Sequence, residues 1–302
     1  MGELVETMKT PAWLRNAGWW LRRAKAPLQD PEPRIGLALG GGFARGIAHL
    51  GVLRSLERHG IKISCIAGVS AGSMVAAAYA SGTPIDEIED IARSMKFKDV
   101  ARWSLSRFGL AHTDRMIGFL KRLLKTDRFE QMQVPLAVVA SDLSTGKPVV
   151  FSGQGDVTTA IRASCAFPGL YQPVRHEGQY LVDGLVSMEV PALPLKQMGA
   201  THTISVSLPS PESTDPRSVF CVVNRCFQIM ATRSEFEWRR HSTLVIEPTV
   251  SKVAWDAFQS SLDLIKAGEE ATDHVIGTIR EWCLPKPNKV QPATSALLRP
   301  AV

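Results

Sequence analysis

The sequence predicts an α/β fold in which helices cover the faces of a mainly parallel sheet. Apolar strand patterns at residues 34–39 and 61–67 are each followed by a glycine-marked turn and a helical pattern, at 47–59 and 74–80. Residues 135–142 add a nearly continuous apolar run, which is typical of a strand buried on both faces. Strands that alternate with helices in this way indicate a parallel sheet with crossover helices.

Composition supports one large globular domain or two small ones. The chain has 302 residues, of which 45% are hydrophobic and 21% charged, so it can form a sizeable core. Its formal net charge is +6, which fits either an ordinary solvated surface or attraction to anionic lipid or nucleic acid. No nucleic-acid-binding module is recognisable, so we expect no nucleic-acid partner. Nothing in the sequence indicates an oligomeric state.

The cysteines indicate a reducing compartment. There are five, an odd number, with no Cys-x-x-Cys spacing, which argues against a disulfide framework and a zinc ribbon. Cys65 and Cys165 lie in apolar or tight segments and are expected in the core. The first residues lack the apolar run of a signal peptide, and no run reaches membrane-spanning length. We therefore expect a cytoplasmic protein.

Residues 1–33 are predicted to be an appendage to the domain. Between residues 9 and 25 there are five basic side chains and no acidic one, interleaved with Trp13, Trp19 and Trp20. This mixture suits a peripheral contact with the inner face of the membrane, and it equally suits a short helix packed on the domain. Residues 34–284 are the predicted α/β domain, and the proline-rich residues 285–302 are the predicted flexible tail.

The later elements follow from local patterns. Residues 96–113 are basic and aromatic, and form either a lid or a surface connection. Two hairpins are predicted, pairing 135–142 with 148–151 and 173–176 with 179–182. Further strands are predicted at 203–208 and 244–246. Helices are predicted at 84–95, 115–124, 156–164 (with Asp156 as its N-cap), 217–240 and 259–283.

A Gly-x-Ser-x-Gly pentapeptide, Gly68-Val69-Ser70-Ala71-Gly72, stands between a strand pattern and a helix pattern. This is the context of a nucleophile elbow, in which a strained turn lifts the serine hydroxyl out of the sheet. Because serine is a poor nucleophile alone, the chain must also supply a base and an oxyanion hole.

The glycine-rich loop before the first helix is the candidate oxyanion hole. Its backbone N–H groups, with the one directly after the nucleophile, are the predicted donors: Gly40, Gly41, Gly42, Phe43 and Ala71. Arg45 would fix the loop or lie near an anionic head group. A dinucleotide loop would need glycine at Arg45, and a Walker loop would need Gly-Lys-Ser/Thr, so a phosphate loop is excluded.

The base is less well marked by the residues alone. Asp183, followed by Gly184, lies at a predicted strand end, although Asp-Gly is also common turn chemistry. Asp142 is a rival carboxylate, but Ser-Thr-Gly after it resembles a capped turn. A Ser…Asp…His order is also available, through His202, His241 or His274. His49 is expected to be a packing or capping residue.

Three ordered motifs carry a resemblance: Gly-Gly-Gly-Phe-Ala-Arg-Gly at 40–46, Gly-Val-Ser-Ala-Gly at 68–72 and Asp-Gly at 183–184. Together with residues 140–146, 162–169 and 181–184, they resemble the patatin-like phospholipase family, particularly its bacterial members. The resemblance covers roughly residues 34–208. One departure is Leu185, where the family often has a second small residue.

The resemblance implies a three-layer α/β/α sandwich and a catalytic dyad. Ser70 would be the nucleophile, Asp183 the base and the glycine loop the oxyanion hole, with Arg45, Gly46, Gly68, Gly72 and Gly184 completing the motifs. The implied reaction is hydrolysis of a phospholipid or another acyl ester through an acyl-serine intermediate, without metal or cofactor. The alternatives are an acyltransferase or thioesterase with the same nucleophile, and a non-catalytic protein that binds a membrane or partner.

Overall fold

The computed structural model describes residues 33–284, apart from 107, 210–217 and 255. Except for Pro33, the predicted appendage at 1–33, with its membrane contact at 9–25, lies outside the described residues. The predicted tail at 285–302 also lies outside them. Both remain predictions.

An eight-stranded sheet forms the centre of the described domain. Its strands follow the order β10, β9, β1, β2, β5, β8, β7, and β6 also pairs with β5. The five strands from β10 to β5 are parallel, whereas β6, β8 and β7 join through antiparallel pairs. The strands are β1 (Ile35–Leu39), β2 (Ile63–Val69), β5 (Leu136–Asp142), β6 (Pro148–Ser152), β7 (Val174–His176), β8 (Gln179–Asp183), β9 (His202–Val206) and β10 (Leu244–Ile246).

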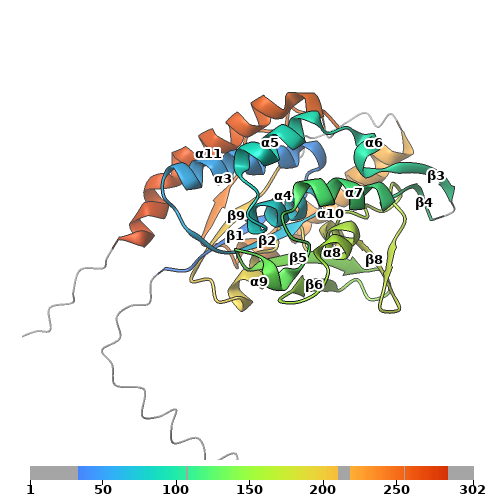
Figure 1. The fold of residues 1–302 in the computed structure, drawn as a ribbon, viewed down its shortest axis with the longest axis horizontal. Coiled ribbons are helices and arrows are strands. Elements are labelled where there is room, and N and C mark those ends of the chain that lie inside the picture. Colours follow the sequence, from blue (N-terminus) through green and yellow to red (C-terminus); the bar gives the residue numbers. More distant parts are fainter. Residues whose placement is uncertain (1–32, 107, 210–217, 255, 285–302) are drawn as a thin grey trace, which may run out of the picture. The chain divides into compact units, whose positions relative to one another are not determined.

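Side-chain alternation along the strands builds a separate core on each face of the sheet. In β1, Leu37 and Leu39 join a large apolar cluster, whereas Ala38 points into a smaller one. The smaller cluster combines small side chains of the sheet with Val190, Leu195 and Trp238, which lie outside its strands. Figure 1 shows α11, α3 and α5 along one side of the sheet and α9 on the other. The expected three-layer α/β/α sandwich is therefore confirmed.

The helices agree with the sequence patterns in most places. They are α3 (Ala48–Arg58), α4 (Ala71–Ala80), α5 (Ile85–Ser94), α6 (Phe97–Val100), α7 (Asp114–Leu123), α8 (Val157–Ser164), α9 (Ala192–Gln197), α10 (Val219–Arg239) and α11 (Ser261–Cys283). Short 3-10 turns occur at Phe43–Ile47, Phe129–Gln131, Gly184–Val186 and Phe258–Ser260. Asp156 caps α8 as predicted, through hydrogen bonds from the amides of Thr158 and Thr159. Both predicted hairpins are confirmed, as β5–β6 and β7–β8.

Residues 96–113, expected to be a lid or a surface connection, contain regular secondary structure. They contain the short helix α6 and a two-stranded hairpin, β3 (Arg102–Ser106) with β4 (Gly109–His112). The hairpin lies outside the main sheet. It is held by tertiary contacts, because the amides of Leu110 and Ala111 both donate to the carbonyl of Leu170. Those partners are distant in sequence, so no local pattern predicts them.

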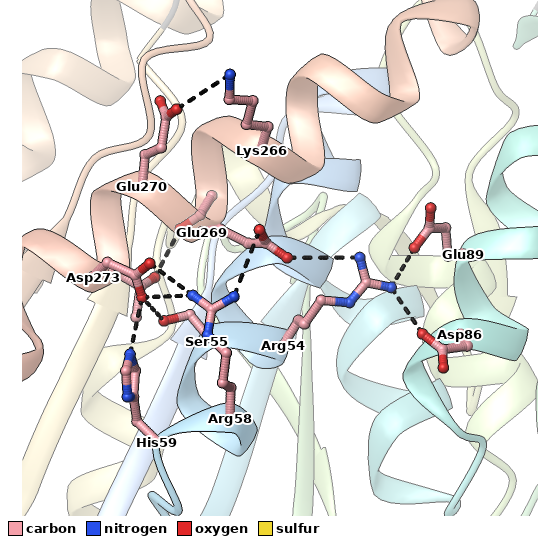
Figure 2. A network of polar contacts seen from close by, with 12 residues as sticks. Arg54, Ser55, Arg58, His59, Asp86, Glu89, Lys266, Glu269, Glu270 and Asp273 are labelled. Atoms are coloured by element: carbon pink, nitrogen blue, oxygen red, sulfur yellow. Dashed lines mark hydrogen bonds and ion pairs between the residues drawn. The ribbon is translucent and has the colours of Figure 1, made fainter.

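Helices α3 and α11 cross in close contact, which holds the helical layer together. A Cβ added at Gly51 of α3 would collide with the backbone of Ile265, and one at Gly268 of α11 would collide with that of Ala48. Figure 2 shows the polar network at the edge of this contact. There Arg54 of α3 pairs with Asp86 and Glu89 of α5 and with Glu269 of α11. Asp273 of α11 accepts hydrogen bonds from Ser55 (2.5 Å) and Arg58 (2.7 Å) of α3.

No helix in the described ranges is both long enough and apolar enough to cross a bilayer.

Candidate active site

Ser70 occupies a strained turn between β2 and α4. Its backbone has φ 52° and ψ −126°, a conformation that non-glycine residues seldom adopt. Three hydrogen bonds hold this turn. The Ser70 amide donates to Ser164 Oγ (2.8 Å), Ser164 Oγ donates to the Val139 carbonyl (2.6 Å), and Ser73 Oγ donates to the Ser70 carbonyl (2.6 Å). The hydrogen bonds with Ser164 and Ser73 thus hold the Ser70 backbone in its strained conformation.

Sheet register brings Asp183 close to Ser70. In β2, Val69 pairs with Val139 of β5, so Ser70 follows at the level of Ala140. On the other side of β5, Ala140 pairs with Asp183, the last residue of β8. Ser70 and Asp183 therefore lie at the same level on either side of one strand, although 113 positions separate them in the sequence.

The Asp183 carboxylate is completely buried. Its Oδ1 accepts a hydrogen bond from the Leu185 amide (2.9 Å), whereas Oδ2 has no partner of standard geometry among the described residues. Burial raises the pKa of Asp183 from 3.8 to about 7, and the Leu185 amide and the Ser70 hydroxyl oppose this rise. The Ser70 hydroxyl is thus close enough to the carboxylate to affect its pKa.

The glycine loop lies beside Ser70. A Cβ placed on Gly41 would be 3.5 Å from Ser70 Cβ. Within the described part of the chain, the Gly41 and Gly42 amides donate to no backbone carbonyl. Gly40 differs, because its amide donates to the carbonyl of Val206 (3.1 Å) and extends the β1–β9 pairing. This bond corrects the expectation that Gly40 supplies an oxyanion donor.

Phe43 and Ala71, the other two predicted donors, both border the cavity at Ser70. Phe43 has φ 51°, so the chain turns sharply there as it enters the 3-10 turn that leads to α3. Ala71 is the first residue of α4, and its amide therefore lies at the positive end of that helix. The cavity next to Ser70 thus meets both the loop and a helix N-terminus.

His49 orients the glycine loop from the protein interior. Its ring is fully buried, and Nε2 lies 2.9 Å from the Gly40 carbonyl oxygen. Because a carbonyl only accepts, Nε2 must carry the hydrogen. Burial lowers the pKa of His49 to about 4, so the ring is neutral near pH 7. In a trans peptide the N–H points opposite to the C=O, so this bond also sets the direction of the Gly41 amide.

The remaining motif glycines allow close packing around the elbow. A Cβ on Gly46 would lie 2.6 Å from Ala71 Cβ, and one on Gly68 would lie 2.5 Å from the Gly72 carbonyl oxygen. Side chains at Gly72 and Gly184 would collide with the backbone carbonyls of Leu39 and Val139. The three motifs are therefore packed against one another.

Arg45 is a buried loop-fixing residue. Its Nη1 donates to the carbonyl of Pro209 (3.0 Å), beyond the end of β9, and burial lowers the pKa of its guanidinium. It is not among the residues that line the cavity at Ser70. Of its two expected roles, the contacts favour fixing the loop over contacting a head group.

An apolar cavity opens at Ser70. It runs between α3, α4, α5 and α7, and nearly all of its lining side chains are apolar. Examples are Met74, Ile88, Met116 and Phe119. Ser70 is one of its few polar lining groups. Such a cavity fits a hydrocarbon chain better than a sugar or a nucleotide, because it offers few hydrogen-bond partners.

The rival base candidates have other partners. Asp142 accepts hydrogen bonds from the Ser144 amide and hydroxyl (3.0 and 2.8 Å), which lower the pKa of its carboxyl, so it caps a turn as expected. His202 begins β9 and stacks on Trp282 (4.8 Å between ring centroids). His202, His241 and His274 are all absent from the lining of the Ser70 cavity.

The sequence patterns did not identify Ser164, Ser73 or Cys165 as site residues. Ser164 and Cys165 lie in the family-like segment 162–169, and only the fold brings them to Ser70. The Cys165 thiol is buried, and burial raises its pKa far above the usual range, so it stays protonated. Among the described residues, no group of three or more His, Cys, Asp or Glu side chains is arranged to hold a metal ion.

The fold defines a class, the α/β/α proteins with a mainly parallel central sheet, and here a strained serine follows one of the central strands. A family model described as patatin-like phospholipase matches residues 37–196, more than half of the chain. The chain therefore belongs to the patatin-like phospholipase family.

Several relatives are named as NTE family proteins or as NTE1 lysophospholipases. An uncharacterised NTE family protein of Mycobacterium tuberculosis is 35% identical over 213 residues, covering 70% of this chain and 56% of the relative. A lysophospholipase of Aspergillus fumigatus is 30% identical over 239 residues, covering 76% of this chain and 15% of the relative. The chain thus spans little more than half the length of the mycobacterial relative, and less of the fungal one.

Solved structures support the fold. VipD of Legionella pneumophila matches with a TM-score of 0.50 and 15% identity, over 82% of this chain and 67% of that one. Human GIVD cytosolic phospholipase A2, in complex with a fluorophosphonate inhibitor, matches with a TM-score of 0.50 and 11% identity. That match covers 88% of this chain and 61% of that one. At these identities the likeness concerns the fold alone.

Proposed function

We propose that the protein is a lipid acyl hydrolase that uses a Ser70–Asp183 dyad. One observation carries this proposal: a strained serine opens into an apolar cavity while a buried carboxylate, with its pKa raised to about 7, lies behind it. The cavity would hold the acyl chain and place the ester carbonyl at Ser70. The membership of the patatin-like phospholipase family supports the same reaction class.

In the first half-reaction, Ser70 Oγ attacks the ester carbonyl carbon while its proton passes to Asp183. The negative charge on the carbonyl oxygen is stabilised by the free amides of the glycine loop, Gly41 and Gly42, and by that of Ala71. The carbon–oxygen bond of the ester then breaks, and Asp183 returns the proton to the leaving alkoxide. The acyl group remains on Ser70.

In the second half-reaction, Asp183 takes a proton from water, and the hydroxide attacks the acyl-serine carbonyl. The fatty acid leaves, and Ser70 Oγ recovers the proton from Asp183. The same carboxyl must accept and donate a proton in each half. A pKa near neutrality suits both tasks at physiological pH.

The cavity and the relatives support a long-chain lipid ester as the substrate class. The cavity lining is apolar from Ser70 inward, which favours long acyl chains over acetyl groups. Several fungal relatives are named lysophospholipases, and this supports a phospholipid or lysophospholipid as the ester.

Lipid-product mass spectrometry of the wild type and Ser70→Ala, with Ser94→Ala as a control, tests the proposal. Ser94 is an exposed serine on α5, outside the lining of the Ser70 cavity. We expect the wild type and the control to release fatty acid from phospholipid or lysophospholipid. Fatty-acid release by Ser70→Ala should be lower than that of the wild type by about a thousandfold or more. Undiminished release by Ser70→Ala would refute the proposal, and acyl transfer to an added alcohol in place of release would assign a transferase.

A further inference from the structure

The β3–β4 hairpin exposes an unusual set of apolar side chains. Trp103 is 66% exposed and Leu110 48%, and Phe108, near the turn between the strands, is exposed as well. Figure 1 shows the hairpin extending from the domain beyond α6 and α7. Single exposed apolar residues are ordinary, but three within eight positions on one projecting hairpin indicate a surface that binds something.

This hairpin borders the route to Ser70. The Trp103 ring contacts the ring of Phe97 (5.3 Å between centroids), and Phe97 lines the Ser70 cavity. A second hollow, lined by Trp103, shares Phe97 and Met95 with that cavity. The hairpin base is fixed to the segment after α8, because Ala111 bonds to Leu170 (2.9 Å) and Gln172 (3.1 Å). Any surface that binds the hairpin would therefore lie close to the Ser70 cavity.

The net positive charge of the chain lies in the stretch of sequence that contains this hairpin. Residues 93–125 contain nine Lys or Arg and two Asp or Glu, while the whole chain carries a net charge of +6. The rest of the chain is therefore close to neutral. Lys96, Lys98 and Arg115 are exposed, and among the described residues none of the three forms an ion pair.

We propose that the hairpin and its basic flank dock onto an anionic phospholipid bilayer. Trp103, Phe108 and Leu110 enter the interface, while Lys96, Lys98 and their neighbours bind lipid phosphates. Aromatic side chains beside basic ones suit the boundary between lipid head groups and acyl chains. A protein partner would instead need complementary acidic groups. Docking would place the mouth of the Ser70 cavity against the acyl chains. The purpose of the contact rests on the proposed lipid hydrolysis, but binding itself does not require Ser70.

Vesicle sedimentation of the full-length Ser70→Ala protein tests the docking without hydrolysis. The vesicles are phosphatidylcholine with and without phosphatidylglycerol. We expect binding only to the anionic vesicles. Trp103→Ser with Leu110→Ser should weaken it on the order of tenfold. Lys96→Glu with Lys98→Glu should weaken it by roughly fivefold or more for each lysine replaced.

Matched controls are exposed residues elsewhere in the fold. Val219→Ser with Phe236→Ser removes two exposed apolar side chains of α10, and Lys62→Glu reverses a charge beyond the basic stretch. Both controls should bind like the parent protein. Unchanged vesicle binding of the hairpin variant, with its fold intact by circular dichroism, would overturn the proposal and leave a protein as the occupant of this surface.

Activity measurements separate this proposal from the proposed function. In the protein with Ser70 intact, the hairpin variant should lower the ratio of vesicle hydrolysis to hydrolysis of a soluble short-chain ester. Vesicle binding without hydrolysis of any ester would contradict the lipid hydrolase assignment while supporting the docking surface. Hydrolysis of both substrates in an unchanged ratio would contradict the docking surface alone.

Discussion

At the scale of single residues, burial decides what each polar group of the site can do. Asp183 is buried with one oxygen held by the Leu185 amide, which leaves its other oxygen for a proton. Cys165 is buried beside it as a neutral thiol, although thiolates are the better nucleophiles. The residue types alone do not reveal this difference, because it arises from desolvation in the folded chain.

His49 provides the first residue-scale prediction. If its hydrogen bond to Gly40 orients the Gly41 amide, His49→Phe should keep the ring-sized volume and lose the donor. We expect kcat to fall on the order of tenfold or more, with KM changed by less than about twofold, because an oxyanion donor acts mainly in the transition state. Steady-state kinetics on a soluble ester measures both constants.

The conservative variant His49→Gln supplies the control. A glutamine amide nitrogen reaches about as far as the imidazole Nε2 and can donate to the same carbonyl. It should recover a large part of the lost kcat. If His49→Phe has the kcat of the wild type and only a lower melting temperature, His49 serves packing alone.

At the scale of elements, the sequence patterns predicted the parts whose partners are local. Both hairpins of the main sheet, the Asp156 cap and the strand–elbow–helix unit follow from turn residues and periodicity. The β3–β4 hairpin was missed because its anchor, the Leu170 carbonyl, is about sixty residues away. Ser164 was missed for the same reason: it reaches the Ser70 amide only because α8 packs on β5.

The α3–α11 crossing gives a prediction for one element pair. Gly268→Ala would push a methyl group into the backbone of α3, so we expect it to lower the free energy of unfolding by about 3 kcal/mol. Gly277→Ala in the same helix meets open space and should raise it by roughly 0.5–1 kcal/mol, because alanine favours helix. Urea unfolding of both variants measures the two changes, and equal effects would contradict the close crossing.

At the scale of the whole molecule, the basic stretch at residues 93–125 and the cavity at Ser70 lie next to each other. Residues 93–125 supply Phe97 and Met116 to the cavity at Ser70, and Trp103 lines a second hollow that shares Phe97 with it, so the proposed docking and the proposed chemistry would involve one region. The family and the sheet architecture were predictable because three motifs occur in a fixed order. The Ser70–Asp183 pair was implied by the family resemblance, whereas the sheet register that brings the two residues to the same level across β5 is visible only in the structure.

In the proposed mechanism Asp183, and no histidine, is the base. Asp183 must be ionised to accept the Ser70 proton, and it becomes protonated as the pH falls below its pKa. The wild-type kcat/KM should therefore rise through about pH 7 and level off above it. A histidine base would give a similar profile, so substitutions must separate the two.

The most direct measurement is kcat/KM at pH 8 for Asp183→Asn beside His202→Gln, His241→Gln and His274→Gln. Asparagine keeps the shape of Asp183 and removes its proton acceptor, so we expect a loss of about a thousandfold or more. The three histidine variants should stay within about twofold of the wild type, because none of these histidines lines the cavity at Ser70. An active Asp183→Asn together with an inactive histidine variant would contradict the dyad.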